Sequence, residues 1–138
     1  LGKHTCELVT RAMDMGYKNV WAVFQPFTFS RTQILLDDFA EALSITDKTV
    51  LTDIMGSREK NTYGIFTRHL AEKINGCIYF PQNEDEEYTD ERKYLNFEQV
   101  CDYICRNAED GDLVITLGCG DVYKVAKMIL KKLNAQKG

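Results

Sequence analysis

The sequence predicts an α/β fold of the Rossmann-like class, in which a mostly parallel sheet carries helices on both faces. Apolar runs of strand length alternate with amphipathic segments of helix length along the 138 residues, a pattern typical of such sheets. The run at residues 20–24 is apolar throughout and therefore suits a strand buried on both faces. The connections are short and rich in glycine and aspartate, as expected of right-handed crossovers within one domain.

The elements are predicted in chain order from their periodicity and their boundary residues. Residues 5–15 form the first helix, and Gly16 can take the left-handed position that often ends a helix. Residues 19–24 form the first strand, and a helix at 30–44 follows with Ser30 as its N-terminal cap. The remaining elements are a strand at 49–53, a helix at 65–75, a strand at 77–80, a helix at 97–107, a strand at 113–117 and a helix at 121–133.

The last two helices each have a stripe of apolar residues that should face the core. In the helix at 97–107, Phe97, Val100, Cys101, Ile104 and Cys105 recur at helical spacing, so both cysteines are expected to be packing residues. The last helix is expected to bury Val122, Val125, Ala126, Ile129, Leu130 and Leu133. The chain has no Cys-x-x-Cys pair and no histidine at zinc spacing, so we expect unpaired thiols and no metal site.

Composition and charge argue against several classes of protein. Apolar residues make up 44% and charged residues 28% of the chain, which is ordinary for a globular protein. The net charge of −4 argues against a nucleic-acid partner, because phosphate binding needs clustered lysine and arginine. No apolar run approaches the length of a membrane span, and no signal segment opens the chain. We therefore expect a cytoplasmic protein with no membrane partner.

One segment interrupts the regular alternation of strands and helices. Residues 81–96 carry six acidic side chains close together, all of them within residues 82–91. Such a charge run is typical of a solvated, mobile surface loop. A cation site is the alternative, although the spacing and the turn glycine of a calcium-binding loop are missing.

A candidate binding turn lies between the first strand and the second helix. Residues 23–32 read Val-Phe-Gln-Pro-Phe-Thr-Phe-Ser-Arg-Thr, in which Pro26 fixes the turn. The guanidinium of Arg31 is a permanent cation at the start of the helix. It can pair bidentately with the carboxylate of a ligand, or it can form a surface ion pair with Asp37 or Asp38.

A second candidate site follows the last strand, where Gly118 and Gly120 precede Asp121. Glycines between a strand and a helix allow close backbone approach and leave helix N–H groups open to an anion. Asp121 can instead cap the helix with its own carboxylate. The third glycine of a dinucleotide fingerprint is missing, and so is any Gly-x-x-x-x-Gly-Lys-(Ser/Thr) loop. The chain by itself is therefore not expected to hold ATP.

Both sites, together with residues 52–62, resemble motifs of the C-terminal domain of the Mur ligases. The first turn is similar to the family's Phe-Gln-Pro-His-(Arg or Thr)-Tyr-(Ser or Thr)-Arg-Thr signature. Residues 118–125 resemble its Gly-Ala-Gly-Asp-Val-Tyr-Lys-Val turn, and residues 52–62 resemble its Thr-Asp-Ile-Tyr-Ala-Ala-Arg-Glu-Lys-Asn-Thr segment. The similarity keeps the same order and spacing from Lys3 to about Leu133.

The resemblance implies that residues 1–138 are the amino-acid-binding C-terminal domain of a larger enzyme, whose UDP-sugar and central ATP-binding domains precede it. Mur ligases use ATP and Mg²⁺ to activate a carboxylate as an acyl phosphate, which the amine of an amino acid then attacks. The likeness is greatest to the branch that joins L-alanine to UDP-N-acetylmuramate. The implied partners are these two substrates and the enzyme's other domains, while this chain alone should be inert and hold no cofactor.

The resemblance also implies roles for individual residues, none of them catalytic. Substrate contacts are implied for Lys3, His4, Phe27, Thr28 and Arg31, and nucleotide or anion contacts for Gly118, Gly120 and Asp121. Arg58 and Glu59 are interpreted as solvated loop residues. Four departures from the family bear on the substrate: Lys3 and Phe27 replace histidines, Thr5 replaces proline and Phe29 replaces tyrosine.

These departures leave the substrate open. One alternative is a related ligase that attaches a different amino acid or a peptide, because Lys3 and Phe27 change the polarity expected near the amino acid. The other alternative belongs to a different class of protein, a Rossmann-like module that binds a small anion without catalysis.

Overall fold

The computed structural model of the chain describes residues 2–80 and 90–137. Within these residues, the centre of the fold is a four-stranded parallel sheet with the strand order β3-β2-β1-β4. The strands are β1 (Val20–Phe24), β2 (Lys48–Leu51), β3 (Ile78–Tyr79) and β4 (Leu113–Leu117). The predicted α/β class and the parallel sheet are confirmed.

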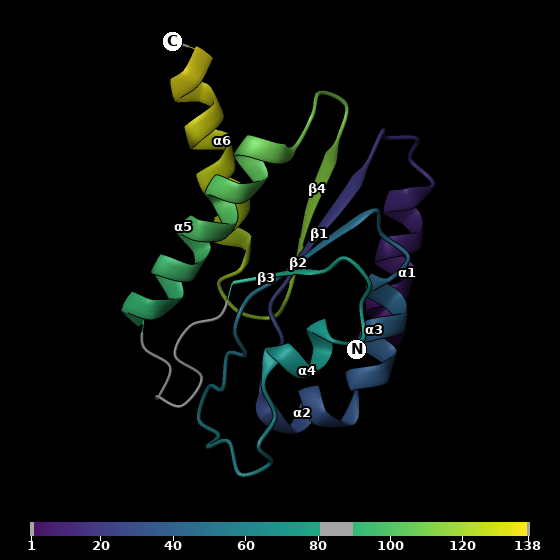
Figure 1. Ribbon diagram of the computed structural model, residues 1–138, viewed down its shortest axis with the longest axis vertical. Helices are drawn as coiled ribbons and strands as arrows, with labels where there is room; N and C mark the ends of the chain where they lie inside the picture. The colour runs from purple at the N-terminus through teal and green to yellow at the C-terminus, as the bar shows by residue number, and fades with distance from the viewer. Residues whose placement is uncertain (1, 81–89, 138) are drawn as a thin grey trace.

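Helices cover both faces of this sheet, as predicted. Figure 1 shows α1 (Gly2–Met13) and α3 (Leu36–Leu43) on one face, and α5 (Asp90–Asn107) and α6 (Tyr123–Lys137) on the other. Along β1, Ala22 and Phe24 join the core under α1 and α3, while Trp21 and Val23 join the core under α5 and α6. All five residues of β1 are buried, which explains why the strand is apolar throughout.

The single helix predicted at residues 30–44 is in fact two helices, α2 (Phe29–Ile34) and α3. They meet at Leu35, which leaves helical geometry with φ −102° and ψ 13° although neither proline nor glycine is present. The cause is tertiary. Hydrogen bonds of Ser30 tie α2 to the loop after β2, whereas α3 packs Phe39 and Leu43 against the sheet.

Two further elements are shorter than predicted. The helix expected at 65–75 is α4 (Thr67–Ala71), which gives way to turns that end at Gly76 with φ 70°. The strand expected at 49–53 ends at Leu51, because β3 pairs only with Val50 and Leu51. Asp53 therefore lies in a loop, where its Oδ1 accepts a hydrogen bond from the hydroxyl of Tyr79 at 2.8 Å.

The helices of the second half also differ from the prediction at their ends. α5 begins at Asp90, so the last part of the predicted loop at 81–96 is helical. Residues 81–89, which hold most of the acidic segment 82–91, lie outside the described residues. On α6, Leu130 and Leu133 are 62% and 38% exposed, so their predicted burial was wrong. The core on this face of the sheet takes up Val125 and Ile129 from α6, and the side of the helix that carries Leu130 and Leu133 is left exposed.

Cys101 is buried in the core under α5 and α6 and Cys105 is half-buried against it, so both are packing residues, as predicted. Burial raises the pKa of the Cys77 thiol to about 11 and that of Cys101 to about 12, so both stay protonated at neutral pH. All five cysteines are free thiols, and Cys119 is the exposed one. In the described part of the chain, no three histidine, cysteine or acidic side chains are grouped to hold a metal ion. Over the same residues, no helix has both the length and the apolar character needed to cross a membrane.

Candidate functional site

The three motifs singled out in the sequence meet at the carboxyl ends of the parallel strands. Gln25, directly after β1, donates its backbone N–H to the carbonyl of Leu117 at the end of β4, at 3.1 Å. Its side-chain Nε2 donates to the carbonyl of Asp53, after β2, at 3.4 Å. Gln25 is 2% exposed, so this contact is made inside the molecule. Ligands of open α/β sheets bind at this edge.

The turn after β1 is held by the backbone of the loop after β2. Thr28 donates its N–H to the carbonyl of Met55 at 2.8 Å, and Met55 donates its N–H to the carbonyl of Pro26 at 2.9 Å. These two bonds form an isolated parallel bridge between Phe27 and Met55. The turn therefore has a fixed shape although it lies beyond the end of the sheet.

Thr28, and not Ser30, is the N-terminal cap of α2, which corrects the prediction. The hydroxyl of Thr28 accepts the N–H of Arg31 at 3.4 Å. The Thr28 backbone has φ 63° and ψ 147°, a conformation that residues other than glycine rarely adopt. Phe29 is consequently the first helical residue, and Ser30 is free to bond elsewhere.

Glu59 is an exposed loop residue, as predicted, but its carboxylate is also hydrogen-bonded to Ser30. Glu59 Oε1 accepts the N–H of Ser30 at 2.9 Å, and Oε2 accepts its hydroxyl at 2.6 Å. These hydrogen bonds, together with the nearby charge of Arg31, hold the pKa of Glu59 below its ordinary value. The carboxylate thus satisfies one of the N–H groups left open at the start of α2.

Arg31 projects from the first turn of α2 and is exposed to solvent. Among the described residues, no carboxylate oxygen lies within 4.0 Å of its guanidinium. The alternative ion pair expected with Asp37 is not formed, because Asp37 pairs instead with Lys73 at 3.0 Å. The cation predicted to meet a carboxylate is therefore presented at the sheet edge without such a partner from this part of the chain.

The glycine turn after β4 packs directly on the first turn. Gly118 has φ 154°, and a Cβ added there would lie 2.9 Å from Val122 Cγ1 and 3.0 Å from the carbonyl oxygen of Gln25. Gly120 has more room, since its added Cβ would lie 3.5 Å from Gln25 Oε1 and 4.0 Å from Phe27 Cδ2. The two glycines therefore differ: Gly118 permits the close packing of two turns, and Gly120 borders Phe27.

Asp121 lies two residues before the start of α6, so it is not the residue that directly precedes the helix. Its carbonyl accepts the N–H of Lys124 at 2.9 Å, and its carboxylate lies 3.8 Å from the ammonium of Lys124. The side chain is half-buried. Whether this turn contacts a nucleotide or an anion stays a prediction.

Lys3 and His4 lie in the first turn of α1, and both are exposed. α1 packs on β1 and is joined to it by a short connection at the amino end of the strand, so the helix starts near the opposite, carboxyl end. Figure 1 shows the N-terminus at that end of the molecule. The structure therefore places Lys3 and His4 at the same edge as the three motifs.

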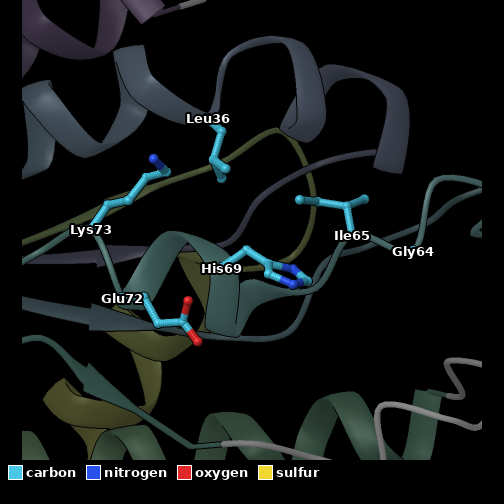
Figure 2. A pocket seen from close by; sticks show the side chains of 6 residues that line it. All are labelled: Leu36, Gly64, Ile65, His69, Glu72 and Lys73. Carbon is cyan, nitrogen blue, oxygen red and sulfur yellow. The ribbon is translucent and has the colours of Figure 1, made fainter.

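A pocket that the sequence did not predict lies beside this edge. It has a volume of about 460 Å³ and is lined by Leu36, Gly64, Ile65, His69, Glu72 and Lys73. Figure 2 shows Leu36 of α3 pointing down into the pocket and Ile65 lying above the imidazole of His69. His69 Nδ1 accepts the N–H of Phe66 at 3.0 Å, so a neutral ring carries its proton on Nε2. No sequence signal marks this pocket, because α3 and α4 meet only in the folded chain.

Three curated proteins that resemble this chain carry one name. No family model matches the chain. A UDP-N-acetylmuramate–L-alanine ligase from Acetivibrio thermocellus is 47% identical over 124 residues, which cover 87% of this chain and 24% of that enzyme. Enzymes of the same name from Lachnospira eligens and Caldicellulosiruptor saccharolyticus are 42% and 39% identical over 127 and 118 residues.

These matches cover 89% and 86% of this chain, but 25% and 24% of the two enzymes. The chain thus spans about a quarter of the length of the curated relatives that it matches. Over most of its own length, the chain is homologous to UDP-N-acetylmuramate–L-alanine ligases and corresponds to a domain-sized segment of them.

Proposed function

We propose that residues 1–138 are the C-terminal, amino-acid-binding domain of a ligase that joins L-alanine to the carboxylate of UDP-N-acetylmuramate. The observation that carries the proposal is Arg31, an exposed cation on a turn braced by both neighbouring motifs at the carboxyl edge of the sheet. A guanidinium at such a position can hold the carboxylate of an incoming amino acid bidentately. The identity of 47% to a named alanine ligase supports this substrate.

In this proposal the rest of the site is shared between this chain and the other domains of the ligase. Phe27, Thr28, Lys3 and His4 border the amino acid, and the turn at 118–121 faces the nucleotide. ATP and Mg²⁺ supply the acyl phosphate when bound, and the described residues offer neither a phosphate-binding loop nor a metal cluster to hold them. In this proposal the UDP-sugar and ATP-binding domains belong to the remainder of the protein, and the complete ligase acts in the cytoplasm.

The test is the Arg31→Ala variant of the complete ligase that contains this segment. Loss of a charge-assisted contact to the amino-acid carboxylate should lower kcat/KM for L-alanine. The expected loss of transition-state stabilisation is about 2–4 kcal/mol, with the KM for ATP unchanged. Arg11→Ala is the matched control, because Arg11 is an exposed arginine in the last turn of α1, toward the other end of the sheet. An equal loss toward both substrates would contradict the proposed contact and indicate a role in folding or domain closure.

A further inference from the structure

Glu59 connects two segments that are far apart in the chain and adjacent in the fold. Ser30 and Glu59 are 29 positions apart, yet both carboxylate oxygens of Glu59 are engaged by Ser30, at 2.9 and 2.6 Å. Glu59 is exposed to solvent, so these two hydrogen bonds, and not burial, hold it in place. The contact is therefore a specific tie between the loop after β2 and the first turn of α2.

Other contacts from the same loop reinforce this tie. Met55 brackets the turn with the two backbone hydrogen bonds described above. Gly56 is covered by the ring of Phe29, since an added Cβ would lie 2.4 Å from Phe29 Cε2. Glu59 donates its own N–H to the carbonyl of Gly56 at 3.0 Å, which closes the loop into a turn. Residues 55–59, here called the clamp, thus contact the turn and α2 from Pro26 to Ser30.

The clamp matters because α2 is too short to be stable by itself. It has six residues, whereas isolated helices shorter than about 12–15 residues are marginal in water. Arg31 lies in its first turn, where N–H groups lack partners within the helix. The orientation of the guanidinium therefore depends on what holds this turn in place.

We propose that Glu59 is a positioning residue for Arg31: by accepting both hydrogen bonds of Ser30, it fixes the first turn of α2 so that the guanidinium is oriented toward the carboxylate of the amino acid. This inference rests on the function proposed above and deepens it. Glu59 acts through Ser30 and does not touch the substrate.

The first test measures the tie itself, in the purified chain. Amide hydrogen exchange of Ser30 and Arg31 should be about tenfold faster in Glu59→Ala than in the wild type, with Glu59→Gln in between because its amide oxygen can still accept one bond. Glu98→Gln, an exposed glutamate on α5, is the control and should leave both amides unchanged. Unchanged exchange in Glu59→Ala would overturn the inference.

The second test measures the consequence, in the complete ligase. Glu59→Ala should raise KM for L-alanine on the order of tenfold and leave KM for ATP unchanged, because misorientation affects only the group that Arg31 holds. The effects of Ser30→Ala and Glu59→Ala should not add in the double variant, since both remove the same tie. Additive effects, or a loss no larger than in Glu98→Gln, would overturn the inference while the ligase function stands. A wild-type ligase without alanine-adding activity would instead overturn the proposed function, and this role of Glu59 with it.

Discussion

Thr28 is the residue of the candidate site whose backbone is strained. Its φ of 63° and ψ of 147° lie in a region that is almost confined to glycine, where strain is about 1–3 kcal/mol. The strain persists because the neighbouring backbone is fixed on both sides, by the Met55 carbonyl and by the hydroxyl of Thr32, which donates to the Thr28 carbonyl at 2.7 Å. The side chain in return caps α2.

Alanine variants are usually more stable than glycine variants, and at Thr28 we expect the opposite. Both Thr28→Ala and Thr28→Gly lose the cap, but only glycine relieves the strain, so the glycine variant should be more stable by about 1 kcal/mol or more. Urea denaturation of the two variants measures this difference. At Thr10, an exposed helical position of α1, the alanine variant should be the more stable one. If the alanine variant were the more stable one at Thr28 as well as at Thr10, Thr28 would not be strained.

Phe27 is the residue where this chain replaces a histidine of the family pattern with an apolar ring. The ring is half-buried and borders Gly120. If it lines the amino-acid pocket, Phe27→His should shift the preference of the complete ligase toward L-alanine over glycine and L-serine, by about 1–3 kcal/mol in relative kcat/KM. Competition between the three amino acids measures the shift. An unchanged order together with a lower melting temperature would mean that Phe27 only packs within the turn.

At the scale of elements, the site depends on how closely the turns after β1 and β4 approach each other. Two glycines in the second turn meet this requirement to different degrees. Gly118 combines a positive φ with contacts under 3.1 Å for an added Cβ, and one of these is to the backbone oxygen of Gln25, which cannot move aside easily. Gly120 has neither constraint.

The two glycines form a matched pair for mutation. Gly118→Ala should destabilise the chain by about 1–3 kcal/mol, because the methyl group forces the two turns apart and strains the backbone. Gly120→Ala, with its nearest atom at 3.5 Å, should change stability by no more than about 0.5 kcal/mol. Thermal unfolding of both variants is the measurement. Equal destabilisation would mean that the close approach of the turns is not what requires glycine.

At the scale of the whole molecule, two carboxylates tie distant segments together and make stability depend on pH. Hydrogen bonds from Ser30 lower the pKa of Glu59. The backbone N–H of Glu109 lowers that of Asp112, with help from Trp21 Nε1 at 3.0 Å and Asn19 Nδ2 at 3.0 Å. A carboxyl whose pKa is lower in the folded chain stabilises it above the unfolded pKa, and this contribution is lost as the pH falls through the folded value.

The melting temperature should therefore hold steady at neutral pH and fall below the ordinary carboxyl values of 4.5 for Glu59 and 3.8 for Asp112. In Glu59→Gln and Asp112→Asn the melting temperature should fall less steeply with pH, because each variant lacks one of the two titrating carboxylates. Calorimetric scans between neutral and acid pH provide the measurement, with Glu98→Gln as the control. If the melting temperature fell equally steeply in all variants, groups other than these two carboxylates would cause the acid sensitivity.

The sequence by itself determined the class of the fold and the edge at which the candidate site lies. The apolar run of β1 and the helical stripe through Phe97 and Ile104 were sufficient to predict the fold class. A strand buried on both faces is apolar throughout, and a helix buried on one side has apolar residues at helical spacing. Once the strands are known to be parallel, the residues that follow β1, β2 and β4 must lie at one edge of the sheet, and this places the three motifs together.

Only the tertiary structure decided how that edge is built. It divided the helix at Leu35, moved the cap from Ser30 to Thr28, joined Ser30 to Glu59, required glycine at position 118 and opened the pocket at His69. It also left Leu130 exposed where the periodicity predicted burial. Each of these features depends on residues that are distant in the chain and adjacent in the fold. Local periodicity records which face of a segment is apolar, but it carries no information about which atoms the fold brings against that face.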